Sequence, residues 1–100
     1  MNVEFLDIAE RELDVDDAFK YYDGIYKGLG LRFIAELESS IERIKLHPDA
    51  WQKASAVTNK CLLNRFPYSI IYQIKGDLLL VVAIASSHQR PNYWANRTSS

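Results

Sequence analysis

The sequence predicts an α+β domain in which a helical hairpin packs on a small, mainly antiparallel sheet. Apolar residues recur at three- and four-residue spacing in the first half of the chain, and they alternate with polar residues in the second half. The predicted order is therefore strand, helix, helix, strand, strand, strand. A chain of 100 residues, 48% of them hydrophobic, can bury one core, so we expect residues 1–100 to form a single domain.

A short strand over residues 2–6 begins the chain, and two helices follow it. The first helix has an apolar face made of Val15, Ala18, Phe19, Tyr22, Ile25 and Tyr26. The second helix has one made of Phe33, Ile34, Leu37, Ile41 and Ile44, and Pro48 ends it. The link Gly28-Leu29-Gly30 is short enough to predict an antiparallel hairpin. It is not a nucleotide-binding loop, since no strand precedes it.

Three strands are predicted in the second half, over residues 60–66, 68–75 and 78–87. Gly76-Asp77 suits a two-residue hairpin turn, which would pair Lys75 with Leu78 and Gln73 with Leu80. That register directs one face toward the helices: Tyr68, Ile70, Tyr72, Ile74, Leu79, Val81, Ala83 and Ala85. The other face would hold Ser69, Ile71, Gln73, Lys75, Leu80, Val82, Ile84, Ser86 and His88. We expect its apolar middle to be an exposed band that binds a partner, or else to be covered by the C-terminal segment.

Several functional classes are disfavoured by composition. The N-terminus is acidic and lacks the pattern of a secretory signal, and the longest apolar run, Leu78–Ala85, is too short to span a bilayer. Cys61 is the single cysteine and has no ligand-spaced Cys or His neighbours, which favours a buried apolar role over zinc binding. We expect a cytoplasmic protein without membrane contact, cofactor or metal.

Charge is distributed unevenly along the chain. Residues 1–50 contain six Lys/Arg and twelve Asp/Glu, a net charge of −6, whereas residues 51–100 contain six Lys/Arg and one acid, Asp77, a net charge of +5. A basic half can attract phosphate backbones or an acidic partner peptide, and scattered surface lysines give the same count.

Two stretches together resemble a known family. The helical half contains YYDGIYKGLGLRFIAELESSIERIKLHP, and the sheet half contains LLNRFPYSIIYQIKGDLLLVVAIASSHQRPNYW. Both look like the RelE/ParE toxin superfamily of bacterial type II toxin–antitoxin systems, and the FPY and H-x-R-x-x-YW elements of the second stretch are the more specific. The resemblance covers nearly the whole chain. The resemblance implies a small toxin of the kind linked to plasmid stabilisation. A cognate antitoxin would neutralise it, and the toxin would contact operator DNA only indirectly, through that antitoxin.

The superfamily has two branches that differ in target. RelE-like toxins cleave messenger RNA on the ribosome, which requires groups that move protons and cations that stabilise the phosphate. Lys60 matches one of the lysine positions that this resemblance implies, but Leu62 and Ser69 stand where two further cations are expected. ParE-like toxins poison DNA gyrase and have no established nuclease chemistry.

The overall pattern favours the ParE-like branch, which implies no enzymatic activity. Two alternatives remain: a ribosome-dependent mRNA endoribonuclease, and an inactive homologue that acts only as an antitoxin-binding co-repressor. If the chain is a nuclease, the candidate catalytic residues are Lys60, Arg65, His88, Arg90 and Tyr93.

Each candidate also has a structural explanation. Arg65 could cover an aromatic ring, His88 could make a structural hydrogen bond, and Tyr93 with Trp94 could clasp the sheet edge. For the antitoxin we expect an apolar anchor over Val82 and a carboxylate against Arg65 or Arg90. The candidate antitoxin-binding residues are Arg65, Ile71, Leu80, Val82, Ile84 and Arg90.

Overall fold

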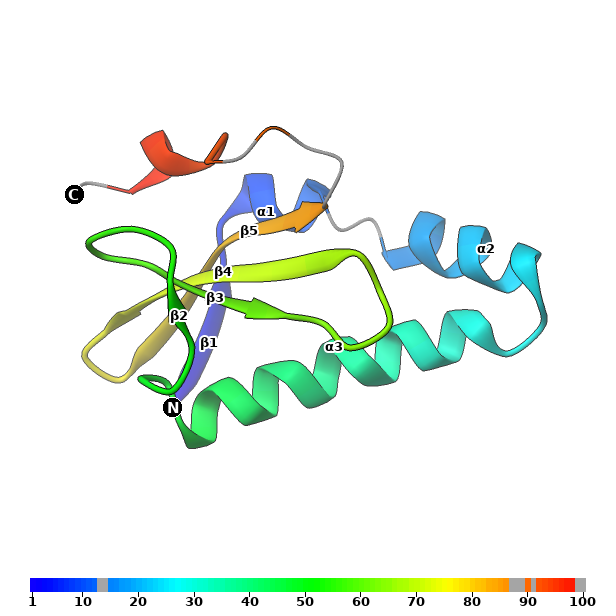
Figure 1. Cartoon of the computed structure of the whole chain (residues 1–100), viewed down its shortest axis with the longest axis horizontal. Helices are drawn as coiled ribbons and strands as arrows, with labels where there is room; N and C mark the ends of the chain where they lie inside the picture. The colour runs from blue at the N-terminus through cyan, green and yellow to red at the C-terminus, as the bar shows by residue number, and fades with distance from the viewer. Residues whose placement is uncertain (13–14, 87–89, 91, 99–100) are drawn as a thin grey trace.

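The computed structural model describes residues 1–12, 15–86, 90 and 92–98, with no account of the side chains of residues 12–16 (Figure 1). Its α-helices are α1 (Asp7–Glu12), α2 (Val15–Ile25) and α3 (Leu29–Leu46), and a 3-10 helix, η1, spans Ala95–Arg97. Its strands are β1 (Asn2–Phe5), β2 (Gln52–Lys53), β3 (Asn59–Leu62), β4 (Tyr68–Lys75) and β5 (Leu78–Ser86). The α+β class is confirmed, with α1 and β2 added to the predicted order. The side chain of Val15, a predicted core position, and Ser87, the predicted end of the last strand, lie outside what the structure describes.

One five-stranded sheet has the order β1-β5-β4-β3-β2. β1 is parallel to β5, and the other neighbouring pairs are antiparallel. The predicted hairpin turn is confirmed, because Gly76 has φ 60° and Lys75 pairs with Leu78. A positive φ suits glycine, which has no Cβ to clash with the backbone. β3 is shorter than predicted, since it ends at Leu62 and leaves Phe66 in the following loop.

A β-bulge changes the register of the hairpin half-way along its length. Tyr72 pairs with Val81, but the next pair is Ile71 with Ala83, so Val82 is an extra residue on β5. An extra residue reverses which face the following side chains occupy. The predicted faces are therefore wrong beyond Val82: Ile84 packs on the helix side, and Ala83 and Ala85 lie on the other.

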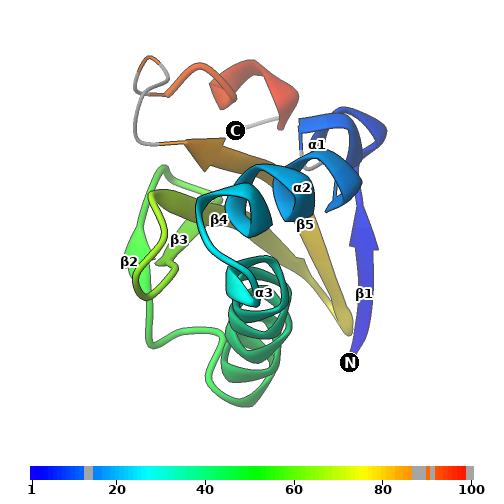
Figure 2. The same cartoon turned by 90° about the vertical axis from the view of Figure 1, so that its right-hand side faces the viewer.

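Helix α3 lies along one face of the sheet, and α2 packs against α3 beyond the ends of the strands (Figure 1 and Figure 2). The core on this side joins α3 to β4 and β5, with Phe33, Ile70, Tyr72 and Val81 among its fully buried side chains. The predicted helical hairpin is confirmed, and Gly30 lies where the two helices meet. A Cβ on Gly30 would lie 2.7 Å from a ring carbon of Phe19, so glycine permits this close approach.

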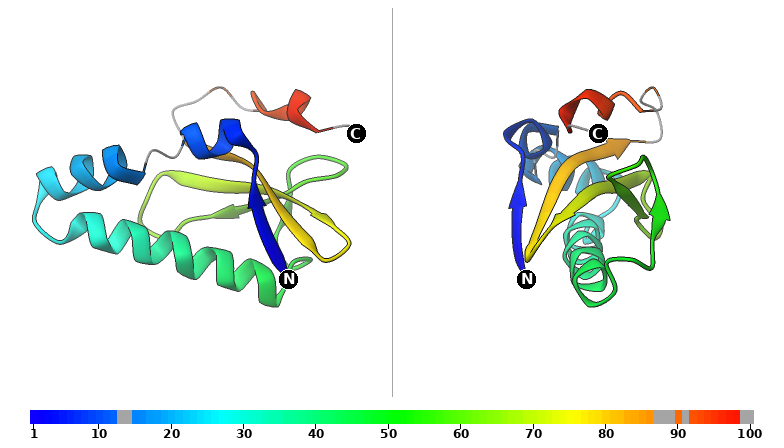
Figure 3. Two further views of the ribbon diagram at one scale, coloured as in Figure 1. Left: turned by 180° about the vertical axis from the view of Figure 1, so that it is seen from behind. Right: turned by 90° about the vertical axis from the view of Figure 1, so that its left-hand side faces the viewer.

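The opposite face is covered by the C-terminal segment, defined here as residues 92–98, while α1 lies alongside β5 and contributes Ala9 to the helix-side core (Figure 3). Trp94, which is 4% exposed, packs against Ile71, Val82 and Ala83. The expected exposed band is therefore wrong, since Ile71, Val82 and Ile84 are 1%, 0% and 2% exposed. The bulge turns Ile84 to the helix side, and the C-terminal segment covers most of the rest. Among the described residues, no helix is long and apolar enough to cross a membrane.

Candidate functional site

A cavity of about 470 Å³ opens on the sheet face that lies opposite α3. We call it the cationic cavity, after Lys53, Lys60 and Arg90 in its wall. Its floor comes from β2, β3 and β4, and the C-terminal segment forms one side. Its lining residues are Gln52, Lys53, Ala54, Lys60, Leu62, Pro67, Ser69, Ile71, Ala85, Ser86, Arg90, Asn92, Tyr93 and Trp94.

Strand pairing explains why these side chains share one face. Lys60 pairs with Gln52 on one side and with Ile71 on the other, and Leu62 pairs with Ser69. Directly paired residues of antiparallel strands project to the same face, so β3 delivers Lys60 and Leu62 to the cavity from alternate positions. Cys61 lies between them and projects into the helix-side core, where burial raises the pKa of its thiol.

The cavity wall is basic and carries several hydrogen-bond donors. Lys53, Lys60 and Arg90 are exposed and come from three separate segments. Ser69 and Asn92 add a hydroxyl and an amide, and no carboxylate occurs among the described lining residues. Such a wall suits an anion, because every charged group in it is positive and none repels a phosphate or carboxylate.

Three of the five candidate catalytic residues meet in this cavity: Lys60, Arg90 and Tyr93. Arg65 does not, since it lies at a different surface, and His88 lies outside the described residues. Leu62 is 62% exposed and stands beside Ser69 in the same wall, so the two positions that lack an expected cation belong to this cavity as well.

A second surface lies between α2, α3 and the loop that joins β3 to β4. We call this hollow of about 760 Å³ the helix groove; it is lined by Tyr22, Ile25, Tyr26, Leu29, Arg32, Ala35, Glu36, Ser39, Asn64, Arg65 and Phe66. The rings of Tyr22, Phe33 and Phe66 pack beside it with centroids 4.9–5.1 Å apart. Burial, with a smaller effect of Tyr68, raises the pKa of Tyr22 to about 12.

Two arginines stand at the helix groove. Arg32 contacts Tyr26, with its Nη1 3.2 Å from the tyrosine hydroxyl. Arg65 is exposed and has φ 69°, a left-handed conformation that is uncommon for a residue with a side chain. Strained residues of this kind cluster at functional sites when the surrounding structure fixes them.

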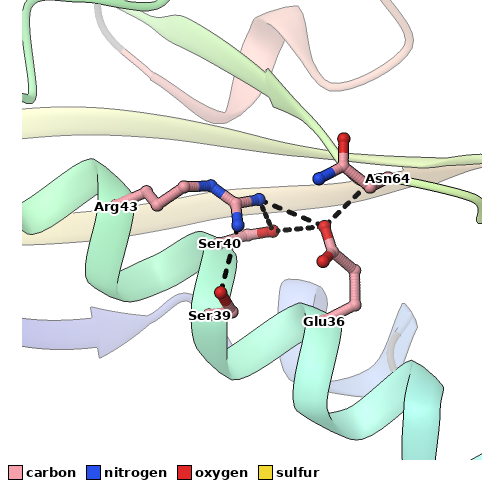
Figure 4. Close-up of polar contacts among 5 residues, drawn as sticks. All are labelled: Glu36, Ser39, Ser40, Arg43 and Asn64. Atoms are coloured by element: carbon pink, nitrogen blue, oxygen red, sulfur yellow. Dashed lines mark hydrogen bonds and ion pairs between the residues drawn. The ribbon is translucent and has the colours of Figure 1, made fainter.

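Glu36 fixes the loop that carries Arg65 (Figure 4). Its carboxylate accepts hydrogen bonds from the Asn64 backbone N–H at 2.7 Å, from the Ser40 hydroxyl at 3.0 Å and from Arg43 at 3.1 Å. Burial of Glu36 disfavours its ionisation, but these hydrogen bonds and the Arg43 charge outweigh burial and lower the pKa of Glu36 below its ordinary value.

Comparison with known proteins identifies the family. The sequence matches the family described as ParE toxin of type II toxin-antitoxin system, parDE, over residues 4–91. The chain belongs to the ParE toxin family. One solved structure with a similar fold is from a chromosomal ParDE toxin–antitoxin system of P. aeruginosa. That chain is 16% identical, with a TM-score of 0.67 over 86% of this chain and 95% of its own length. No curated protein shows significant sequence similarity.

Some residues at these two surfaces of the ParE domain were not predicted. Lys53 lies in a two-residue strand, which is too short to show a period of two. The helix groove has no signature in the sequence, because residues as far apart as Tyr22 and Phe66 line it together. The sequence does indicate one polar cluster on the second helix. Spacings of four and three residues place the polar side chains of Glu36, Ser40 and Arg43 on one helix face.

Proposed function

We propose that this ParE-family chain slows bacterial growth by poisoning DNA gyrase, and that a cognate antitoxin neutralises it. The observation that carries the gyrase assignment is the pairing of Leu62 with Ser69 in the wall of the cationic cavity. Cleavage of RNA by its own 2′-hydroxyl needs charge stabilisation around the phosphate. An apolar side chain and a neutral hydroxyl supply none at the two positions where a RelE-like nuclease would carry cations.

Proton transfer supports the same conclusion. A nuclease of this kind needs a general base for the attacking hydroxyl and a general acid for the leaving oxygen, roles filled most often by histidine, glutamate or aspartate. The described lining of the cationic cavity contains none of these three residue types. Of the less common proton-transfer groups the described wall holds Lys60 and Tyr93, so binding of an anion without its cleavage is supported mainly by the missing cations at Leu62 and Ser69.

One observation favours the nuclease alternative, namely that Lys60, Arg90 and Tyr93 share one cavity. Expression of the chain without an antitoxin distinguishes the possibilities. We expect slowed growth with induction of the DNA-damage response, while transcripts remain intact. Transcripts cut at ribosomal A-site codons would instead assign the nuclease activity, and unaffected growth with soluble, folded protein that binds an antitoxin would assign the co-repressor role.

For the antitoxin, we propose the helix groove as the binding surface. The buried position of Val82 argues against the anchor expected from the sequence, since Trp94 covers that part of the sheet. The groove instead offers an aromatic floor with exposed Ile25 and Tyr26 beside it, and Arg65 at its edge. An amphipathic segment with acidic residues would match both features, its apolar face against the rings and a carboxylate against Arg65.

Charge reversal at Arg65 tests this surface. We expect Arg65→Glu to weaken antitoxin binding by about tenfold or more, because it replaces an attractive pair with a repulsive one. Lys75→Glu is the matched control, since Lys75 is exposed at the β4–β5 turn and lines neither surface. Equal affinity of the two variants in a titration with the antitoxin would exclude the helix groove.

A further inference from the structure

Half of the basic residues in positions 51–100 line a single cavity. Three of the six basic residues in this half, Lys53, Lys60 and Arg90, line the cationic cavity. We propose that this cavity binds the phosphodiester backbone of a nucleic acid, independently of base sequence and without cleaving it. The inference goes beyond gyrase poisoning and does not require it, because it concerns direct contact between this chain and a polyanion.

The cations of this cavity are available to a ligand. Ion pairs between described residues join Arg43 to Glu36 and Lys45 to Glu42, all on α3 at the other face of the sheet. No ion pair among the described residues involves Lys53, Lys60 or Arg90, and each of these side chains is exposed. A phosphate that enters the cavity therefore does not have to displace a carboxylate of the described residues.

The size and the neutral donors of the cavity fit the same ligand. A volume of about 470 Å³ lies within the range of small-molecule sites, which is roughly 300–1,000 Å³, and leaves room for a nucleotide unit. Gln52, Ser69 and Asn92 contribute amide and hydroxyl groups of the types that contact phosphate oxygens. Contacts of this kind fix the position of the backbone but carry no base information.

Base stacking is not available to supply sequence preference. The Arg97 guanidinium lies 5.0 Å from the centroid of the Tyr93 ring, and Trp94 is buried against the sheet. Both large aromatic side chains of the cavity are thus engaged within the chain. The recognition that remains is electrostatic, which predicts similar affinity for different base sequences.

An acidic peptide is the other polyanion to consider, and the cavity fits it less well. A peptide partner gains most of its affinity from apolar anchors. At the cationic cavity Ile71 and Trp94 are already buried, which leaves Leu62 as the exposed large apolar side chain among the described lining residues. The helix groove, on the other side of the sheet, offers the aromatic surface that a peptide would use.

Fluorescence anisotropy with the purified full chain tests the proposal in the absence of gyrase. The probes are a labelled DNA duplex, a DNA single strand and an RNA strand, each in several base sequences, with polyglutamate as the acidic-peptide probe. Three phosphate contacts predict a slope of log affinity against log salt of about −2.1 for single strands and about −2.7 for duplex DNA, so that a fourfold rise in salt weakens binding roughly 20- to 40-fold. A preference for duplex DNA would point to the DNA that gyrase holds, and a preference for RNA would point to transcripts.

Variants locate the contact. We expect Lys53→Gln and Lys60→Gln each to weaken nucleic-acid binding by about 3- to 10-fold and to reduce the magnitude of the salt slope by roughly one. Lys27→Gln is the matched control, since Lys27 is exposed in the link between α2 and α3 and should leave both quantities unchanged. Unchanged binding by both cavity variants, no binding at low salt, or equal binding of polyglutamate would each overturn the proposal. Because the assay contains no gyrase, its failure would leave the gyrase assignment standing.

Discussion

Glu36 connects two segments that are distant in the sequence, because its carboxylate on α3 binds the Asn64 backbone N–H in the β3–β4 loop. It also accepts from Ser40 and Arg43 one and two turns further along α3. A hydrogen bond to a charged group contributes more to stability than one between neutral groups, by a factor of about two. The left-handed backbone of Arg65 is thus held by a neighbour that is itself fixed to a helix.

The lowered pKa of Glu36 gives its contribution a pH dependence. A carboxyl whose pKa is lower in the folded state stabilises the fold above its unfolded pKa, near 4.5, and this stabilisation is lost as the pH falls through the folded pKa. We expect Glu36→Gln to lower the free energy of unfolding by about 1–2 kcal/mol at neutral pH, with the difference from wild type shrinking below about pH 4.5. Urea denaturation across this pH range measures it.

Glu38→Gln is the control for this series, because Glu38 lies on the same helix with its side chain exposed. It should have little effect on the free energy of unfolding at any pH. If Glu36→Gln lowers the free energy of unfolding by the same amount at pH 3 as at neutral pH, the carboxylate charge is not the source of the stabilisation.

At the scale of elements, the bulge in β5 determines which residues form the core. Up to the pair of Tyr72 with Val81, side chains alternate as the sequence indicated, and beyond it the alternation is reversed. Ile84 thereby enters the helix-side core, while Ala83 and Ala85 face the C-terminal segment. Small residues at those two positions allow Trp94 to approach the sheet closely.

Truncation of Ile84 tests this account of the bulge. We expect Ile84→Ala to lower the free energy of unfolding by about 2–5 kcal/mol, because it leaves a cavity among buried side chains. Leu62→Ala, at an exposed position of the same sheet, should change it by less than about 0.5 kcal/mol. Chemical denaturation of the two variants compares them directly, and equally mild effects would place Ile84 back on an exposed face.

Periodicity predicted the helical hairpin, the turn at Gly76-Asp77 and the register beside it. It could not predict the bulge, because Val82 lies in a continuous apolar run where an extra residue changes no local property. Periodicity also could not predict that Trp94 packs back on the sheet, because Trp94 lies after the last strand in a segment without a repeating apolar pattern. The sequence also predicts candidate site residues without showing which of them meet. The structure brings Lys60, Arg90 and Tyr93 into one cavity and places Arg65 at the helix groove.

At the scale of the whole molecule, the sheet separates two surfaces of different character. The helix groove lies on the side of α2 and α3 and combines aromatic rings with Arg65. The cationic cavity lies on the opposite side and presents Lys53, Lys60 and Arg90 without a carboxylate among its described lining residues. This arrangement allows an antitoxin to be recognised at one surface while the other contacts an anionic ligand, with no need for the two sites to overlap.

The most direct test of the proposed function is the amount of plasmid that purified gyrase leaves cleaved in the presence of this chain. Supercoiled plasmid, gyrase and increasing amounts of the protein are incubated under turnover conditions, protein is denatured, and linear DNA is quantified. A gyrase poison traps the enzyme on cut DNA, so we predict that linear DNA increases with protein concentration and that prior addition of the antitoxin abolishes the increase. Unchanged linear DNA, from a preparation that cuts messenger RNA on ribosomes, would contradict the gyrase assignment.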